Sequence, residues 1–250
     1  MTNRQLYGLV GRTLGHSFSR SYFTEKFERE AIKADYINFE LPEIEDLPGL
    51  VASSPGLCGF NVTIPYKQEI IPLLDELDAS ALMVGAVNVV SVLPGGRLKG
   101  YNTDAAAFGE SLRRLLGDRP VPGQALVLGT GGASLAVKAA LDEMGVHTQF
   151  VSRNEGEARV CYRRLTNDIV VRCGIIVNTT PLGMWPNTED APAIPYDAVG
   201  PSHVCFDLVY NPEPTLFMRL AASRGAAVRG GLEMLRLQAD ASWRIWQENR

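Results

Sequence analysis

Metal-binding and disulfide patterns are missing from this sequence. The few cysteines and histidines are scattered along the 250 residues: Cys58, Cys161, Cys173 and Cys205, and His16, His147 and His203. Zinc sites bring such residues together in closely spaced pairs, and disulfide frameworks belong to short, cysteine-rich secreted chains. The sequence therefore predicts neither a metal site nor a disulfide framework.

Long apolar runs and an excess of one charge are missing as well. The first seven residues lack the apolar core of a signal peptide, and no run approaches the roughly 20 apolar residues of a membrane-spanning helix. The net charge of -4 gives no general attraction to nucleic acid or to a membrane surface. We expect a reduced, cytoplasmic enzyme of one large or two modest domains.

What the sequence does contain is a nucleotide-binding pattern. Residues 124–128 form a short apolar run typical of a buried strand, a glycine-rich turn follows, and residues 133–144 have helical spacing. Such a turn lets the backbone approach a pyrophosphate, and the helix N-terminus offers it free N–H groups. A tight strand-to-helix turn alone gives the same pattern, so the motif is weak by itself. The residues predicted to bind the cofactor here are Gly129, Thr130, Gly131, Gly132 and Ala133.

The end of the following strand favours NADP over NAD. An NAD site usually has an acidic residue about 20 residues after the glycines, bound to the ribose hydroxyls. Here the chain reads Ser152-Arg153-Asn154, with no acid before Glu155. A guanidinium at this position suits a 2′-phosphate, because it donates paired hydrogen bonds. The alternative is that Arg153 is an ordinary solvated loop arginine.

Polar residues also follow the predicted strands of the N-terminal half. Ser17 and Ser19 stand before a helix predicted over residues 21–30, where two hydroxyls either cap the helix or hold a carboxylate. Lys67 precedes a helix predicted over residues 68–82 with a break at Pro72, and a lone lysine there is usually a solvated helix start. By themselves these residues do not indicate a function; only the motifs around them do.

Two further polar residues stand out near the middle of the chain. Asn88 lies in an otherwise apolar strand, so its side chain needs hydrogen-bond partners. Asp104 opens a helical pattern over residues 105–116, where an aspartate ordinarily caps the helix. We place a domain boundary between residues 104 and 122, because residues 117–123 are rich in glycine and proline.

Taken together, these motifs resemble the shikimate dehydrogenase family. The match covers nearly the whole chain in the right order, and the set is far more specific than any single motif. The matching segments are His16–Ser19, Asn61–Lys67, Gly85–Asn88, Tyr101–Asp104, Gly129–Ser134, Ser152–Asn154, Asn178–Met184, Asp207–Pro212 and Gly231–Gln238.

The resemblance implies an α/β fold with two domains. Residues 1–104 plus 232–250 would form the substrate domain, to which the C-terminal helix returns, and residues 105–231 a Rossmann-like NADP-binding domain. The implied reaction is the reversible NADPH-dependent reduction of 3-dehydroshikimate to shikimate, in the pathway to chorismate and the aromatic amino acids. Its partners are small molecules, and the chain is expected to be a monomer or a homodimer.

The resemblance also implies roles for individual residues. Lys67 would be the catalytic proton donor, and Asp104 its carboxylate partner, which also accepts a substrate hydroxyl. The residues implied to bind the rest of the substrate are Ser17, Ser19, Thr63, Asn88, Tyr210 and Gln238. Thr179 would lie near the cofactor, and Leu208 and Gly231 would border its nicotinamide.

The chain departs from the family pattern in four places. Prolines usually stand at Thr13 and Arg20, so the serine turn is less rigid here, and a glycine usually stands at Glu233, near the nicotinamide end. Between residues 152 and 175 there is room only for one strand, predicted over residues 160–165, and one short helix, predicted over residues 168–173. One crossover helix is therefore expected to be truncated or missing.

Three alternatives remain open at this point. A sister enzyme of the family oxidises quinate or accepts either acid, often with NAD. A non-catalytic sensor would bind shikimate without turnover, but it would not need Lys67 and Asp104, which are both present. Another small-molecule dehydrogenase on a similar scaffold would not require the paired serines.

Overall fold

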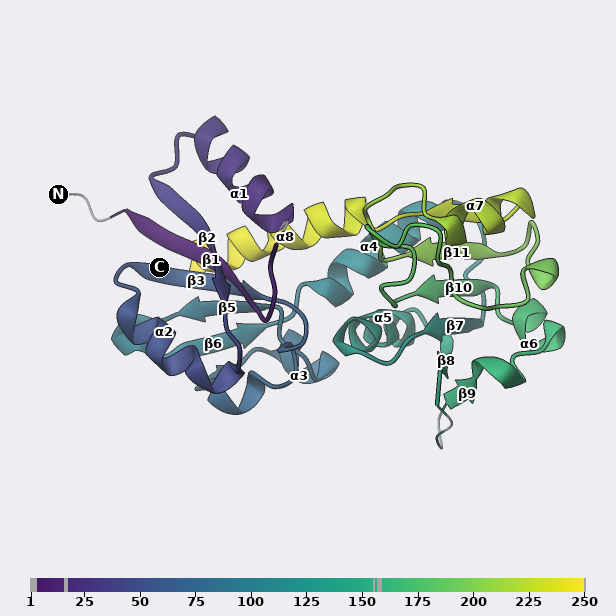
Figure 1. Cartoon of the computed structure of the whole chain (residues 1–250), viewed down its shortest axis with the longest axis horizontal. Coiled ribbons are helices and arrows are strands. Elements are labelled where there is room, and N and C mark those ends of the chain that lie inside the picture. Colours follow the sequence, from purple (N-terminus) through teal and green to yellow (C-terminus); the bar gives the residue numbers. More distant parts are fainter. Residues whose placement is uncertain (1–3, 16–17, 155, 157–158, 250) are drawn as a thin grey trace. The chain divides into compact units, whose positions relative to one another are not determined.

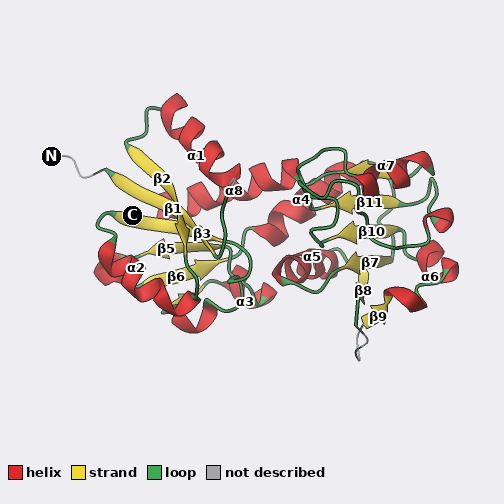
Figure 2. Cartoon of the chain, in the orientation of Figure 1, coloured by secondary structure: helices red, strands yellow, loops and turns green. Residues whose placement is uncertain are grey.

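The computed structural model describes residues 4–15, 18–154, 156 and 159–249 (Figure 1). The chain divides into two compact units, one made of Met1–Thr103 with Ala239–Arg250 and the other of Asp104–Gln238. In the described residues each unit is built around a six-stranded sheet with helices on its faces (Figure 2). No helix in the described part of the chain has both the length and the apolar character needed to cross a membrane.

The first unit has a mixed sheet in the order β2-β1-β3-β5-β6-β4. Parallel pairs join β1 to β2 and to β3, whereas β5 runs antiparallel to β3 and β6. The strands are β1 (Gln5–Gly11), β2 (Ala34–Glu40), β3 (Leu57–Val62), β4 (Glu76–Leu77), β5 (Val89–Val92) and β6 (Leu98–Tyr101), and the helices α1 (Phe18–Arg29), α2 (Leu47–Ser53), α3 (Ala79–Val84) and the end of α8 (Leu232–Glu248).

Aromatic side chains from distant parts of the sequence fill one face of this sheet. Tyr7 on β1, Phe23 on α1 and Trp246 on α8 are fully or almost fully buried, and their ring centroids lie 4.8–5.4 Å apart where they touch Trp246. The indole Nε1 of Trp246 also donates a hydrogen bond to the Val90 carbonyl at 3.0 Å.

The second unit has a fully parallel sheet in the order β12-β11-β10-β7-β8-β9. Its central strands are buried on both faces, which explains their continuous apolar runs. The strands are β7 (Gln124–Leu128), β8 (His147–Ser152), β9 (Arg159–Cys161), β10 (Ile175–Asn178), β11 (Val204–Asp207) and β12 (Ala227–Arg229), and the helices α4 (Asp104–Leu116), α5 (Gly132–Glu143), α6 (Asn167–Arg172) and α7 (Leu216–Ser223). The described residues thus confirm the α/β fold with a Rossmann-like sheet.

The helix predicted over residues 68–82 is wrong. The segment instead forms turns, a 3-10 turn at Ile71–Leu73, the short strand β4 and the helix α3. Pro72 cannot donate a backbone hydrogen bond, and Asp75 and Asp78 bind other groups: Asp75 accepts from the Leu98 N–H at 2.7 Å, and Asp78 caps α3 at Ser80. Pairing with β6 therefore replaces the helix.

The expected loss of a crossover helix is confirmed in the described residues. β9 pairs with β8 directly after a short connection, and α6 follows close to the helix predicted over residues 168–173. The predicted strand over residues 160–165 is shorter than expected, because a 3-10 turn occupies Tyr162–Arg164. Thr166 then caps α6 by accepting from the Ile169 N–H at 3.4 Å.

Candidate active site

The glycine turn joins β7 to α5 and lies against the end of β10. Gly129 has a φ of 113°, which favours glycine, and a Cβ at this position would lie 2.6 Å from the Thr179 Oγ1. The Thr179 hydroxyl donates to the Leu128 carbonyl at 2.8 Å, which fixes it beside the turn. The structure therefore brings together two of the residues that the sequence and the resemblance assigned separately to the cofactor.

The N-terminus of α5 is open to a ligand. Its cap is Gly131, which has no side chain to occupy the first N–H groups, and Thr130 and Gly131 are exposed. Ser134 is fully buried, and its hydroxyl donates to the Gly131 carbonyl at 2.6 Å, so it tightens the turn. With the dipole of a 12-residue helix behind it, this end favours a bound phosphate.

Arg153 follows β8 with its backbone anchored and its side chain exposed. The Ser152 hydroxyl donates to the Asn154 carbonyl, and the Cys161 thiol donates to the Arg153 carbonyl at 3.4 Å. Arg153 and Asn154 are both exposed. An exposed guanidinium at the end of the second strand of such a sheet is chemically able to bind an anion on the ribose of a dinucleotide.

Two buried polar residues, whose roles the sequence did not reveal, connect the ends of β10 and β11. Asn178 and Asp207 are both fully buried, and the Asn178 Nδ2 donates to the Asp207 Oδ1 at 2.9 Å. Burial raises the pKa of Asp207 to about 6, although hydrogen bonds from Thr215, Val209 and Asn178 counteract it. The signal in the sequence is a polar residue that directly ends an apolar run.

Leu208 and Gly231 lie in contact. A Cβ at Gly231 would come within 2.2 Å of the Leu208 carbonyl oxygen, so only glycine fits here.

Elsewhere in the second unit, Tyr210 is half-buried, and burial raises the pKa of its hydroxyl. Gln238 is largely buried, and its Nε2 donates to the Leu235 carbonyl at 3.1 Å.

In the first unit, Asn88 holds the turn that precedes Asp104. It is 2% exposed; its Oδ1 accepts from the Thr103 N–H at 2.8 Å and its Nδ2 donates to the Thr103 hydroxyl at 2.9 Å. The expectation that this polar side chain has partners is confirmed. Asp104 is the first residue of α4 and is 5% exposed, so its carboxyl stands at a positive helix end.

Lys67 lies in a series of hydrogen-bonded turns and does not start a helix. It is half-buried, and its carbonyl accepts from the Val87 N–H at 2.7 Å, which ties it to the residue next to Asn88. Thr63 is anchored nearby, because its N–H donates to the Val10 carbonyl and the Val62 N–H donates to the Asn88 carbonyl, both at 2.9 Å. The backbones of Thr63, Lys67 and Asn88 are thus held close together at the end of β3 and the start of β5.

A buried chain of hydrogen bonds links Ser19 to the same region. Ser19 is buried on α1 and bonds to the Tyr36 hydroxyl, which donates to the Asn61 Oδ1 at 2.9 Å. The Asn61 Nδ2 in turn donates to the Ser242 hydroxyl at 2.9 Å and the Asn88 carbonyl at 3.2 Å. Tyr36 and Ser242 are members of this network that sequence reasoning missed. Ser17 and His16 lie outside the described residues.

Glu233, where the family usually has glycine, is fully engaged. Its carboxylate accepts hydrogen bonds from the Ser111 hydroxyl at 2.5 Å, from Arg114 at 3.0 Å and from Arg229. Although burial raises the pKa of Glu233, the bonds from Ser111 and Arg114 and the charge of Arg229 bring it below its usual range. Of the other departures, Thr13 and Arg20 are exposed.

The described residues contain no cluster of three or more His, Cys, Asp or Glu side chains arranged for a metal ion. The four cysteines are free, and all but Cys58 are buried. The groups described above are instead an open helix end and an exposed arginine in the second unit, neutral hydrogen-bonding side chains in both units, and the charged residues Lys67 and Asp104. These groups suit a dinucleotide and a small hydroxylated molecule.

The fold and these groups define an α/β protein with a Rossmann-type dinucleotide-binding unit. The family model described as the shikimate dehydrogenase substrate binding domain matches residues 9–90. Shikimate dehydrogenase (NADP(+)) of Desulforamulus reducens is 34% identical over 262 residues, covering 97% of this chain and 89% of the relative. The chain belongs to the shikimate dehydrogenase family.

Solved structures agree with this assignment over nearly the whole chain. Shikimate dehydrogenase from Aquifex aeolicus is 32% identical with a TM-score of 0.87, covering 99% of this chain and 94% of that one. Shikimate 5-dehydrogenase from Thermus thermophilus, solved in complex with NADP(H) and shikimate, is 31% identical with a TM-score of 0.85 and covers 98% and 94%.

Proposed function

We propose that this protein catalyses the reversible NADPH-dependent reduction of 3-dehydroshikimate to shikimate, a step toward chorismate and the aromatic amino acids. The observation that carries the proposal is that backbone hydrogen bonds hold Lys67 next to Thr63 and Asn88, so one cationic residue lies beside neutral hydrogen-bonding residues. The complex of the Thermus thermophilus relative with NADP(H) and shikimate supports this choice of substrate and cofactor. The enzyme acts in the cytoplasm, as a monomer or a homodimer.

The chemistry requires one cation near the reacting carbonyl. Bound NADPH supplies the hydride, and negative charge then develops on the carbonyl oxygen. The Lys67 ammonium stabilises this charge and delivers the proton, which makes it the catalytic acid. Asp104 orients the ammonium and accepts a hydrogen bond from a substrate hydroxyl.

Neutral polar side chains bind the remainder of the substrate. The hydroxyls of Ser17 and Ser19 hold the carboxylate, which requires Ser19 to turn its hydroxyl hydrogen from Tyr36 toward the ligand. The ring hydroxyls bind to Thr63, Asn88, Tyr210 and Gln238. Such a ring needs many directed hydrogen bonds, because burying a hydroxyl without a partner costs about 1–3 kcal/mol.

The cofactor lies on the second unit in this proposal. The glycine turn and the open end of α5 bind the pyrophosphate, and Arg153, with Ser152 and Asn154, binds the 2′-phosphate. Thr179, Leu208 and Gly231 border the nicotinamide. Residues 105–231 then serve as the NADP-binding domain, and residues 1–104 with 232–250 as the substrate domain.

The test is a parallel assay of shikimate oxidation with NADP and with NAD, followed at the absorbance band of the reduced nicotinamide. Fast reduction of NADP and slow reduction of NAD is the expected result. Activity with NAD alone, together with faster turnover of quinate, would assign the protein to the quinate-type branch instead. Shikimate binding in calorimetry without turnover with either cofactor would make it a sensor.

A further inference from the structure

The carboxyl group of Asp207 joins three separate segments of the second unit. Its Oδ1 accepts from the Asn178 side chain at 2.9 Å and from the Val209 N–H at 3.0 Å, and its Oδ2 accepts from the Thr215 hydroxyl at 2.6 Å. Asn178 ends β10, Val209 lies in the loop after β11, and Thr215 caps α7. Every partner comes from a segment at the carboxyl edge of the sheet.

On the β10 side, Asp207 sets the orientation of the Asn178 amide. Because the Asn178 Nδ2 points at the carboxylate, its Oδ1 faces the next loop and accepts from the N–H and hydroxyl of Thr180, at 3.0 and 2.6 Å. Thr179, which packs against Gly129, lies between these two anchors. The geometry of the loop at the glycine turn therefore depends on Asp207.

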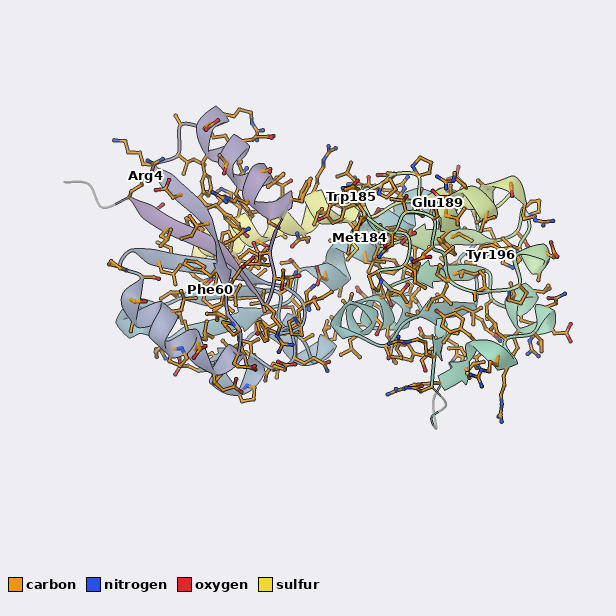
Figure 3. The ribbon with its side chains drawn as sticks, in the orientation of Figure 1. Arg4, Phe60, Met184, Trp185, Glu189 and Tyr196 are labelled. Atoms are coloured by element: carbon orange, nitrogen blue, oxygen red, sulfur yellow. The ribbon has the colours of Figure 1, made fainter. Side chains whose placement is uncertain are left out.

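On the β11 side, the same carboxylate fixes Leu208. The Val209 N–H binds Asp207, the Leu208 N–H donates to the Asn178 carbonyl at 2.9 Å, and the Gly231 N–H donates to the Val209 carbonyl at 3.1 Å. Leu208 is thereby pressed against Gly231. Farther along, the Trp185 N–H donates to the Asn211 carbonyl at 3.0 Å, so the two loops also meet beside the exposed Met184 and Trp185 (Figure 3).

The ionised carboxylate is the form that satisfies all these partners. It accepts three hydrogen bonds, while the Thr215 oxygen accepts from the Met218 N–H at 3.2 Å at the start of α7. A protonated Asp207 would have to donate to Thr215, whose own hydroxyl hydrogen would then lose its acceptor. Such an unpaired buried donor is costly, so protonation loosens the network.

We propose that Asp207 is a positioning residue for the nicotinamide half of the cofactor, and that cofactor binding requires its ionised form. This inference rests on the proposed function, which assigns Thr179, Leu208 and Gly231 to the cofactor. Asp207 itself is fully buried and acts through the two loops that it connects.

The surroundings make this ionisation sensitive to mild acid. Burial brings the pKa of Asp207 to about 6, and the negative charge of Glu213 adds to the effect. Tyr196 of the neighbouring 3-10 turn and Cys205 of β11 also face this region, and burial raises both of their pKa values, so both stay neutral at mildly acidic pH. Arg229 on the adjacent β12 is bound to Glu233 and does not neutralise Asp207.

The experiment compares NADP binding by the whole protein and by Asp207→Asn in calorimetry at pH 5, 6, 7 and 8. The amide keeps the shape and can still accept from Asn178 and Val209, but it does not titrate. Protonation of the 2′-phosphate affects both proteins equally, so the ratio of their dissociation constants isolates Asp207. We expect the Kd of the wild type, relative to the variant, to rise about tenfold between pH 7 and pH 5. Asp197→Asn, which removes an exposed carboxylate of the same unit, serves as the control and should follow the wild type.

If the ratio of the wild-type and variant dissociation constants stays constant with pH, the inference is overturned. A merely structural role of Asp207 would change the Kd of the variant by the same factor at every pH, without a break near pH 6. If Asp207→Asn does not fold, Thr215→Val decides the matter. This variant removes a donor to the carboxylate, so the break should move to higher pH, and an unmoved break would count against Asp207. If the wild type turns over at pH 8 but the ratio of dissociation constants does not change with pH, only this inference is contradicted. A wild type that binds no NADP would contradict the proposed function.

Discussion

At the scale of single residues, the buried Asp207 opposes stability while it organises the loops. Its pKa is raised from 3.8 to about 6, because burial disfavours the charge more than the hydrogen bonds to it favour it, so the folded state binds the proton more tightly than the unfolded chain does. The tighter binding of this proton stabilises the folded state by about 3 kcal/mol. This stabilisation is fully present below pH 4 and is lost as the pH rises through 6. We expect Asp207→Asn to gain thermal stability relative to the wild type as the pH rises from 4 to 7. Thermal melts test this expectation. A difference in melting temperature between variant and wild type that stayed constant from pH 4 to pH 7 would contradict the raised pKa.

Lys67 carries the sharpest catalytic prediction. Lys67→Ala should lower kcat by about 100-fold or more, because a positioned general acid contributes about that factor. Shikimate should still bind with nearly unchanged affinity, since the neutral groups around it remain. Lys99→Ala on β6, whose ammonium lies 3.9 Å from Glu76, is the matched control and should keep normal activity. Steady-state kinetics and calorimetry separate the two effects, and near-normal kcat in Lys67→Ala would remove the assigned role.

Arg153 makes a prediction about the choice of cofactor. Arg153→Gln should raise the KM for NADP by about 10- to 100-fold, the loss expected for a charge-assisted contact to phosphate, and leave the KM for NAD unchanged. Arg163→Gln, which changes an exposed arginine in the turn after β9, should leave both values as they are. Equal changes for both cofactors in Arg153→Gln would show that the guanidinium does not read the 2′-phosphate.

At the scale of elements, Glu233 ties the start of α8 to α4 and β12. Removal of its partly buried carboxylate by Glu233→Ala should lower the free energy of unfolding by about 1–3 kcal/mol, because Ser111, Arg114 and Arg229 lose their acceptor. The pKa of Glu233 is lowered, so its contribution is present at neutral pH and fades as the pH falls below about 4.

Denaturant unfolding of wild type and Glu233→Ala at pH 7 and pH 3 measures this effect. Glu143→Gln, which changes an exposed acid 4.0 Å from Arg113, is the control and should be nearly neutral. If Glu233→Ala lowered the free energy of unfolding as much at pH 3 as at pH 7, packing and not the ion pairs would anchor α8.

Elements with strong local signals were predictable, and those decided by distant partners were not. The run at Ala125–Leu128 and the glycines after it define a strand and a turn by themselves, and the shortage of residues after Ser152 predicts a missing helix. Residues 68–82 contain enough apolar positions for a helix, but Asp75 and Asp78 bind groups near β6 that no local pattern reveals. The same holds for the site: Lys67 and Arg153 stand in motifs, whereas the bonds from Asp207 to Asn178 and from Tyr36 to Asn61 join residues 25 or more positions apart.

At the scale of the whole molecule, the core of the first unit depends on the last turns of the chain. Trp246 is 1% exposed and packs on Tyr7 and Phe23, so Trp246→Ala should destabilise the protein by about 3–5 kcal/mol. Hydrogen exchange should show faster opening of β1 and β3 than of β7 and β10. Trp243→Ala is the milder comparison, since that ring is only partly buried. Equal acceleration in both sheets would contradict the division into two units.

The position of Trp246 and Ser242 also fixes an order of events on the ribosome. Residues 104–238 form one continuous segment, so every part of their sheet is synthesised before residues 239–249. The first 103 residues leave the exit tunnel earlier, yet the face that holds Tyr7 and Phe23 stays uncovered until residues 239–249 emerge. Since nascent domains fold as units when their chain is complete, the unit whose synthesis begins first is the one that closes last.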